Sequence, residues 1–389
     1  MERVAGDLYL LRVDDTAVRY FEAMWEVPEG VTYNAYLLLT AEGAVLFDGW
    51  KREFGELFAE AVGRVADLRD IRVAVVHHAE PDHSGTAGLV AEAAPRATFV
   101  GHPVAGRILR SHYGIERFKP VADGEALEIG GVRLRFVHAP WLHWPDTIVT
   151  AVEGEGLLLT CDIFGSYSTP PPFDDQTDLA QLSRYVRKYV VTVIGHYIDW
   201  VPKGVERVRA ALPGPRVIAP AHGTVYRSRP SWVVEEYLRV ASGQPERGKA
   251  VLVGVSAYGN VGRALEALGE ALRARGWRVV EYLFTDRERP PASEVLTDAS
   301  DAELLALGVS TYEASAHPLA EHLAKLIAWK LPHRRSMPLL VLSSYGWAPA
   351  GKRLLELLRS QGFTSVKLVE FEGRLFERGL EEALAALPG

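Results

Sequence analysis

The amino-acid sequence predicts an α/β protein with two domains, of which the second is a doubly wound parallel sheet. Its 389 residues are enough for two hydrophobic cores. Strand and helix patterns alternate regularly only in the C-terminal part of the chain, and a short polar stretch with Gly and Pro, residues 242–249, precedes that part. We therefore expect one domain over residues 1–245 and another over residues 249–389.

The composition is that of an ordinary globular protein, with 48% hydrophobic and 24% charged residues. A net charge of −7 gives no indication of nucleic acid or an anionic membrane as partner. Cys161 is the single cysteine, which excludes a disulfide within the chain and a Cys-rich zinc or iron–sulfur site. The N-terminus has no apolar signal segment, and no run approaches about 18 apolar residues. These features predict a cytoplasmic protein.

In the first domain, short strands and helices are expected to form two sheets with helices outside. Apolar patterns predict strands at 7–13, 32–40, 44–48, 71–76, 97–101, 157–160 and 216–220, and a hairpin over 125–138. Helical spacing predicts helices at 53–65, 86–94, 103–112, 178–191, 204–211 and 231–241, the last with Ser231 as its N-cap.

In the second domain, the alternation predicts a parallel sheet of five strands with helices on both faces. The expected strands are 250–255, 277–283, 304–308, 337–342 and 365–370, and the expected helices are 261–275, 318–329, 350–361 and 375–387. The acidic stretch 286–301 contains two prolines and is interpreted as a solvated connection.

The most informative stretch is 78–86, which directly follows the buried strand at 71–76. It brings four potential metal ligands together, His78, Glu80, Asp82 and His83. A strand end that turns sharply can direct several side chains to one point, and ligand types at this density are unusual in a simple polar loop.

Three further residues have suitable chemistry and context. His143 lies in the run His-Trp-Pro-Asp-Thr, whereas Asp162 and His222 each follow a predicted strand. Together with the loop this makes seven groups. Since one metal takes roughly four to six ligands, seven groups suggest two metals that share a bridging carboxylate, for which Asp162 is the natural candidate.

This pattern resembles the metallo-β-lactamase superfamily and, within it, the flavodiiron proteins. The resemblance implies a metallo-β-lactamase-like αβ/βα sandwich for the first domain. Hydrolases of that superfamily usually carry His at the second ligand position, where this chain has Glu80, and a carboxylate there favours redox-capable iron over zinc. The implied ligands are His78, Glu80, His143 and Asp162 for one iron, and Asp82, His83, Asp162 and His222 for the other.

Three neighbouring residues need a different interpretation. His77 adjoins the motif but points to the opposite face if the chain is extended there. His138 is expected to be structural or to support a ligand. Asp146 could orient a ligand histidine, but an Asx-turn after Pro145 is the simpler prediction.

In the second domain, three loops beyond strand ends resemble those of a flavodoxin, which implies FMN as cofactor. They contain Ser256, Tyr258, Gly259 and Asn260; Ser310 and Thr311; and Ser344, Tyr345, Gly346 and Trp347. The first group would hold the phosphate at a helix N-terminus, and the others would flank the ribityl chain and the ring. Val261 and Gly262 stand where Thr and an acidic residue are common, so one phosphate hydrogen bond is in question.

Both resemblances together imply a flavodiiron oxidoreductase that reduces dioxygen to water or nitric oxide to nitrous oxide, with FMN feeding electrons to two irons. They also imply a head-to-tail homodimer or dimer of dimers, and a separate electron donor such as a rubredoxin or a flavin reductase. Two alternatives stay open: a zinc-dependent hydrolase with a fused flavodoxin domain, and an electron carrier whose metal site is only structural. The preference for either gas is left open.

Overall fold

The computed structural model describes residues 2–373 and 376–385. The chain divides into two compact units, the first formed by Met1–Val190 with Asp199–Leu238 and the second by Val191–Ile198 with Arg239–Gly389. No helix of the described residues is both long and apolar enough to cross a membrane.

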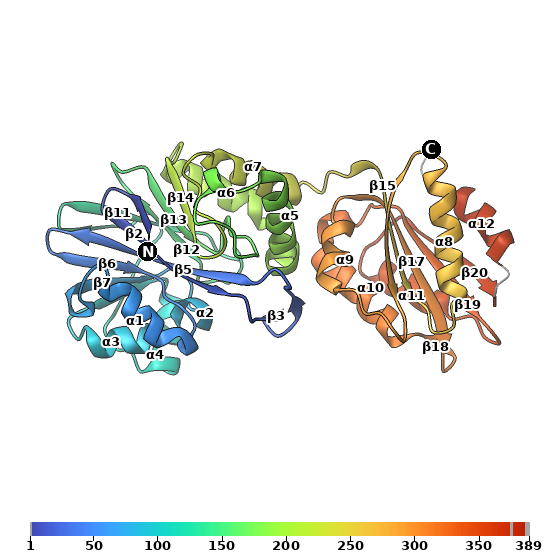
Figure 1. Ribbon diagram of the computed structural model, residues 1–389, viewed down its shortest axis with the longest axis horizontal. Helices are drawn as coiled ribbons and strands as arrows, with labels where there is room; N and C mark the ends of the chain where they lie inside the picture. The colour runs from blue at the N-terminus through green and yellow to red at the C-terminus, as the bar shows by residue number, and fades with distance from the viewer. Residues whose placement is uncertain (1, 374–375, 386–389) are drawn as a thin grey trace. The chain divides into compact units, whose positions relative to one another are not determined.

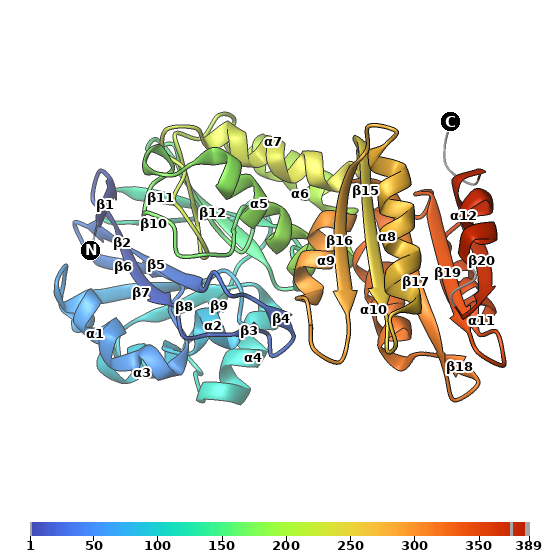
Figure 2. The same cartoon turned by 45° about the vertical axis from the view of Figure 1, so that its right-hand side comes forward.

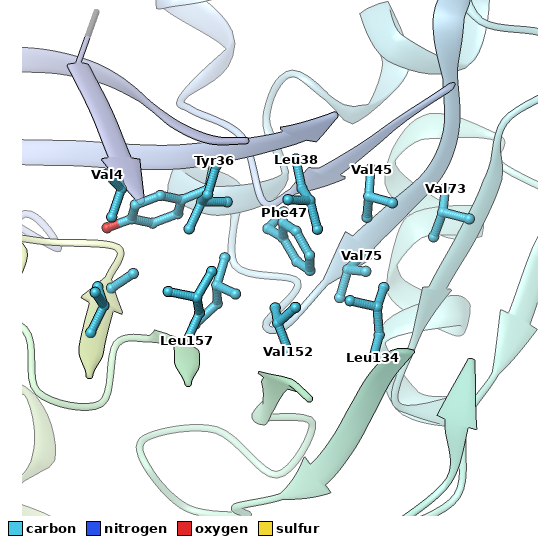
Figure 3. Close-up of a cluster of buried hydrophobic side chains, with 14 of the residues drawn as sticks. Val4, Tyr36, Leu38, Val45, Phe47, Val73, Val75, Leu134, Val152 and Leu157 are labelled. Carbon is cyan, nitrogen blue, oxygen red and sulfur yellow. The ribbon is translucent and has the colours of Figure 1, made fainter. Parts of the chain in front are cut away.

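Unit 1 contains two mixed sheets that pack face to face. The first has the order β1 (Glu2–Ala5), β2 (Leu8–Asp15), β5 (Val31–Thr40), β6 (Gly43–Phe47), β7 (Ile71–Val76), β8 (Thr98–Gly101), β9 (Phe118–Pro120). The second has the order β10 (Ala126–Ile129), β11 (Val132–His138), β12 (Ile148–Val152), β13 (Leu157–Cys161), β14 (Val217–Pro220). Figure 3 shows side chains of both sheets meeting in one core, among them Phe47 and Val75 from the first and Leu134, Val152 and Leu157 from the second.

Helices cover the outer faces of these sheets, which completes the predicted αβ/βα sandwich. On one side lie α1 (Gly55–Gly63), α3 (Ala87–Ala93) and α4 (Pro103–Tyr113), and on the other α5 (Leu179–Tyr189), α6 (Trp200–Ala211) and α7 (Pro230–Ala241) (Figure 1). The prediction of Ser231 as an N-cap is wrong, because α7 begins at Pro230 and Ser231 is already helical. The strands β1, β9 and β12 and the short hairpin of β3 (Tyr20–Phe21) and β4 (Trp25–Glu26) were not predicted.

Unit 2 is a doubly wound parallel sheet, as predicted. Its strand order is β16 (Arg278–Phe284), β15 (Glu246–Val255), β17 (Ala302–Tyr312), β19 (Leu339–Tyr345), β20 (Val366–Glu372), and β18 (Ser315–Ala316) pairs antiparallel with the end of β17. One face carries α8 (Asn260–Arg273) and α12 (Phe376–Ala385), and the other α9 (Ala292–Ala299), α10 (Pro318–Lys330) and α11 (Gly351–Ser360) (Figures 1 and 2). Residues 375 and 386–387 of the last predicted helix lie outside the described residues.

The interpretation of residues 286–301 as a solvated connection is wrong, because α9 lies within it and is largely buried. Lys249 of β15 explains the burial of its acidic end. The ammonium of Lys249 donates hydrogen bonds to Asp298 at 2.9 Å and to Asp301 at 2.5 Å. Paired in this way, the carboxylates are stable in a buried position that their charge alone would forbid. The strand β15 also begins at Glu246, within the stretch interpreted as a linker.

Candidate functional site

The polar centre of unit 1 lies where strands of both sheets end. On the first sheet, β7 leads into a loop and then into α2 (Pro81–Ser84), a helical turn with proline at its first position. This turn directs consecutive side chains inward, because a single helical turn replaces the alternation of the strand. The second sheet contributes residues that follow β11, β13 and β14. The seven predicted ligands, His78, Glu80, Asp82, His83, His143, Asp162 and His222, all come together here.

These side chains form two groups that meet at Asp162. In the first group, Nε2 of His78 and Nε2 of His143 lie 3.0 and 3.1 Å from Oε2 of Glu80. Both of these imidazole nitrogens lie 3.6 Å from Oδ2 of Asp162. One carboxylate oxygen of Asp162 therefore faces the first group.

The second group approaches the other oxygen of the same carboxylate. Nε2 of His83 lies 3.1 Å from Oδ1 of Asp162, and Nε2 of His222 lies 3.4 Å from it. Nε2 of His222 is also 3.4 Å from Oδ2 of Asp82. Because each oxygen of Asp162 faces a different group, this carboxylate has the geometry of a bridge between two cations.

Three buried atoms in the centre have no hydrogen-bond partner among the described residues: Oδ1 of Asp82, Oδ2 of Asp162 and Nε2 of His222. A buried polar atom left in this state costs about 1–3 kcal/mol. Each of these atoms can offer a lone pair, which is what a metal ion needs. A mixed set of imidazoles and carboxylates suits iron, so the residues present fit a two-iron centre.

The electrostatics of the centre are those of closely packed, opposite charges. Burial alone lowers the pKa of His222, but the carboxylates of Asp162 and Asp82 raise it overall to about 10. Burial raises the pKa of Asp162, but His83 and His222 hold it well below its ordinary value. The imidazole of His222 therefore binds a proton tightly in the absence of a metal, and a metal must displace this proton.

Two ligand histidines are oriented through their other ring nitrogen. Nδ1 of His78 lies 3.2 Å from Oδ1 of Asp146, and Nδ1 of His222 lies 2.7 Å from the backbone oxygen of Thr32. When each Nδ1–H donates to these acceptors, the Nε2 lone pairs face the centre. The prediction that Asp146 forms only an Asx-turn is thus wrong, because its oxygens bond to residues 78 and 79 instead.

Tyr189, the last residue of α5, belongs to the centre but was not predicted from the sequence. Its hydroxyl donates a hydrogen bond to Oδ1 of Asp162 at 2.8 Å. No signal in the sequence distinguished this residue from a core tyrosine.

His77 lies off the centre as predicted, with Nδ1 2.7 Å from Oδ2 of Asp48 and Nε2 2.8 Å from Oγ1 of Thr150. His138 also stays apart, with Nε2 3.0 Å from the backbone oxygen of Val121.

A cavity of about 520 Å³ gives access to the centre. Glu80 and Asp82 line it from the metal side. Phe21 from the β3–β4 hairpin and Lys51 form other parts of its wall. A cavity of this size admits small molecules to one carboxylate of each group, Glu80 and Asp82.

In unit 2, the flavodoxin-like loops gather at one edge of the sheet. Neighbouring parallel strands β15, β17 and β19 end there, close to Ser256, Ser310 and Ser344. This edge lies at the point where the strand order reverses, which is where doubly wound sheets bind ligands. The remaining predicted residues at this edge are Tyr258, Gly259, Asn260, Thr311, Tyr345, Gly346 and Trp347.

Two features of this edge fit a flat phosphorylated cofactor. Tyr258 is 93% exposed and Trp347 75% exposed, and such aromatic rings need a cover. The N-terminus of α8 follows Gly259, whose φ of 84° suits a tight turn. Ser256 Oγ accepts a hydrogen bond from the Gly262 backbone N–H at 3.2 Å, whereas Val261 is only 1% exposed and packs in the core.

The model of the family described as "ODP family beta lactamase" matches residues 31–223. A type A flavoprotein from Rhodobacter capsulatus is 30% identical to this chain, and the match covers 92% of this chain and 83% of the relative. A nitric oxide reductase from Moorella thermoacetica is 28% identical, and the match covers 91% of this chain and 88% of the relative. Among solved structures, a flavo di-iron protein variant from Thermotoga maritima has 37% identity and a TM-score of 0.92, covering 99% of this chain and 97% of its own. The rubredoxin oxygen:oxidoreductase from Desulfovibrio gigas has 25% identity and a TM-score of 0.92, and the match covers 99% of this chain and 96% of that structure's chain.

Proposed function

The chain belongs to the flavodiiron proteins, the A-type flavoproteins, and from this premise we propose that it reduces dioxygen to water, nitric oxide to nitrous oxide, or both. The observation that supports this most directly is Asp162, whose two oxygens face two separate groups of ligand-type side chains. When bound, the irons supply the site of gas reduction and FMN supplies the electrons.

We infer that two sets of side chains hold the irons and share Asp162. His78, Glu80, His143 and Asp162 would hold one iron, and Asp82, His83, Asp162 and His222 would hold the other. Glu80 in the first set favours iron, because a carboxylate is a harder ligand than the imidazole it replaces. Tyr189 fixes the shared carboxylate through its hydrogen bond to Oδ1 of Asp162.

We infer that FMN binds at the loop edge of unit 2. Ser256, Tyr258, Gly259 and Asn260 would surround its phosphate, and Ser310, Thr311, Ser344, Tyr345, Gly346 and Trp347 would line the ribityl chain and the ring. The first loop precedes the helix α8, whose free backbone N–H groups attract a phosphate dianion. Trp347 offers an exposed indole as a stacking surface for the ring.

The two alternatives are less favoured. A zinc hydrolase is disfavoured by relatives that carry the names of oxidoreductases, among them the rubredoxin-oxygen oxidoreductase of Megalodesulfovibrio gigas. A purely structural metal site is disfavoured by the cavity beside Glu80 and Asp82, since structural sites are usually closed.

The same proposal includes the localisation, the electron donor and the oligomeric state of the protein. We infer a cytoplasmic protein that receives electrons from a separate protein, a rubredoxin or a flavin reductase. We also infer a head-to-tail homodimer or a dimer of dimers, in which the FMN of one subunit serves the irons of another. Sedimentation tests the assembly: a monomer that retains full turnover would contradict it.

Metal and flavin content of the purified protein, followed by gas uptake, tests the proposed function. We expect about two irons and one FMN per chain, and rapid consumption of dioxygen or nitric oxide after reduction. Zinc without flavin, together with cleavage of an ester or lactam, would contradict the proposal and favour the zinc hydrolase. Bound iron and FMN without uptake of either gas would favour the electron carrier.

A further inference from the structure

Tyr33 on β5 has a buried hydroxyl with no hydrogen-bond partner among the residues that the structure describes. The residue is only 1% exposed. Buried hydroxyls in folded proteins are almost always hydrogen-bonded, because an unbonded one lowers stability. The partner of this hydroxyl is therefore expected to come from outside the polypeptide.

The surroundings of Tyr33 place it beside the metal centre. Its ring lies edge-on to the imidazole of His222, with a centroid distance of 5.5 Å and an interplanar angle of 71°. The ammonium of Lys51 lies 4.8 Å from the centre of the same ring. Lys51 also lines the 520 Å³ cavity, as do Glu80 and Asp82. Tyr33 thus contacts both a ligand histidine and a lysine that lines the cavity beside the metal centre.

The missing partner of Tyr33 differs in kind from those of its neighbours. Oδ1 of Asp82 and Nε2 of His222 also lack partners, but they offer lone pairs, which a cation can take up. A phenol is a hydrogen-bond donor and needs an oxygen or nitrogen lone pair instead. The ordinary pKa of a tyrosine is about 10, so its hydroxyl carries a proton to donate at neutral pH.

We propose that Tyr33 donates a hydrogen bond to the small molecule bound in the metal cavity, whether water, the gas that is reduced or an anion that takes its place. This inference rests on the proposed function, because it assigns a role towards the molecule that the irons hold. A donor fixed by packing orients such a molecule and stabilises the negative charge that reduction places on it.

Tyr36 provides a matched control on the same strand. Its side chain is 2% exposed, and its hydroxyl donates a hydrogen bond to the backbone oxygen of Pro220 at 2.7 Å. Tyr36→Phe therefore removes a hydrogen bond inside the protein, whereas Tyr33→Phe removes a hydroxyl that has no partner there. The two variants delete the same atom from two similarly buried rings.

The experiment compares azide binding and stability in the iron- and FMN-loaded wild type, Tyr33→Phe and Tyr36→Phe. Azide is titrated into the oxidised protein by its visible absorption, and stability is measured by urea denaturation of the metal-free protein. We expect Tyr33→Phe to bind azide about 5- to 10-fold more weakly and to keep or raise the wild-type urea midpoint, because the variant loses an unbonded buried hydroxyl. Tyr36→Phe should show the reverse, with wild-type azide affinity and a lower midpoint.

Two results would overturn the inference alone. The first is an iron-loaded Tyr33→Phe that binds azide as tightly as the wild type. The second is a urea midpoint for Tyr33→Phe that falls as far as that of Tyr36→Phe, which would mean that the hydroxyl is bonded within the protein. A wild-type protein that holds no iron would instead overturn the proposed function and the inference with it.

Discussion

Oδ1 of Asp146 lies 3.2 Å from Nδ1 of His78, and both side chains are fully buried. The other oxygen of Asp146 accepts a hydrogen bond from the backbone N–H of Ala79 at 2.9 Å. Burial raises the pKa of Asp146, but the hydrogen bond and charge of His78 lower it overall, which keeps the carboxylate ionised. Asp146 thus fixes both the ring of a ligand histidine and the backbone next to it.

Asp146→Ala should weaken metal binding, because it leaves the His78 ring free to turn. We expect a loss of about 10- to 100-fold in affinity, measured by competition with a chelator. Asp67→Ala is a suitable control, because Asp67 is an exposed carboxylate that bonds only to Arg69 among the described residues. Equal affinities in the two variants would mean that the contact of Asp146 with His78 has no influence on the metals.

Glu80→His should shift the metal preference from iron towards zinc. The carboxylate of Glu80 lies 3.0 Å from Nε2 of His78 and 3.1 Å from Nε2 of His143, so it replaces an imidazole within the first ligand group. Exchange of this hard oxygen ligand for a nitrogen favours the softer metal. Elemental analysis after reconstitution with equal iron and zinc measures the ratio, with Glu80→Asp as the control that keeps the oxygen ligand. An unchanged ratio in Glu80→His would show that this position does not select the metal.

Periodicity and motif spacing predicted both layers of unit 1, the parallel sheet of unit 2 and the strand ends that carry polar residues. Strand β7 at Ile71–Val76 was predicted with its observed bounds. Local patterns of this kind suffice to predict a strand or a helix, because the spacing of the apolar residues shows which face of the element is buried. The strand β12 was missed because it follows a loop with two tryptophans and two prolines, which gives no clear strand start.

Partners that are far apart in the sequence could not be predicted. Asp146 and His78 are 68 residues apart, and the Asx-turn was the prediction that local chemistry favoured. The helix α9 was missed for the same reason, since its acidic residues appear solvated until Lys249 of another element is brought beside them. In the sequence Tyr189 cannot be told from an ordinary core residue, and only the packing of α5 shows its hydrogen bond to Asp162.

Gly259→Ala should weaken FMN binding more than riboflavin binding. Gly259 has a φ of 84°, a left-handed conformation that strains any residue with a Cβ atom. The added Cβ would come no closer than 3.7 Å to Arg263, so the expected effect is on the backbone of the loop and not on packing. We expect the loss, about 1 kcal/mol, to appear in fluorescence titrations with FMN, because only FMN presents a phosphate to this turn. If Gly259→Ala loses equal affinity for FMN and for riboflavin, the FMN phosphate does not bind at this turn.

Lys249→Met should destabilise unit 2 by about 3–5 kcal/mol. The substitution removes the buried ammonium that compensates Asp298 and Asp301. Urea denaturation measures the loss, and the triple variant with Asp298→Asn and Asp301→Asn should recover part of it, because it also removes the buried negative charges. A cost of less than about 1 kcal/mol for Lys249→Met would mean that water reaches these carboxylates.

His333 should make unit 2 sensitive to acid. Both ring nitrogens are buried and without a hydrogen-bond partner among the described residues. Burial, and next to it the charge of Arg334, lower the pKa of His333 from 6.5 to about 4. The unfolded chain therefore binds a proton at this residue between pH 6.5 and pH 4, whereas the folded chain does not. This contribution to stability is complete above pH 6.5, is lost as the pH falls and levels off below pH 4.

His333→Gln should remove this part of the pH dependence, because glutamine has no proton to gain. For the wild type we expect a loss of about 2 kcal/mol between pH 6.5 and pH 4, after allowance for partial exposure of the ring. Hydrogen exchange of β17 amides follows unit 2 alone, so titration of the metal ligands in unit 1 does not interfere. His322→Gln, at an exposed histidine of α10, is the matched control and should keep the wild-type slope. If His333→Gln and His322→Gln lose protection in parallel with the wild type, the acid sensitivity of unit 2 comes from another group.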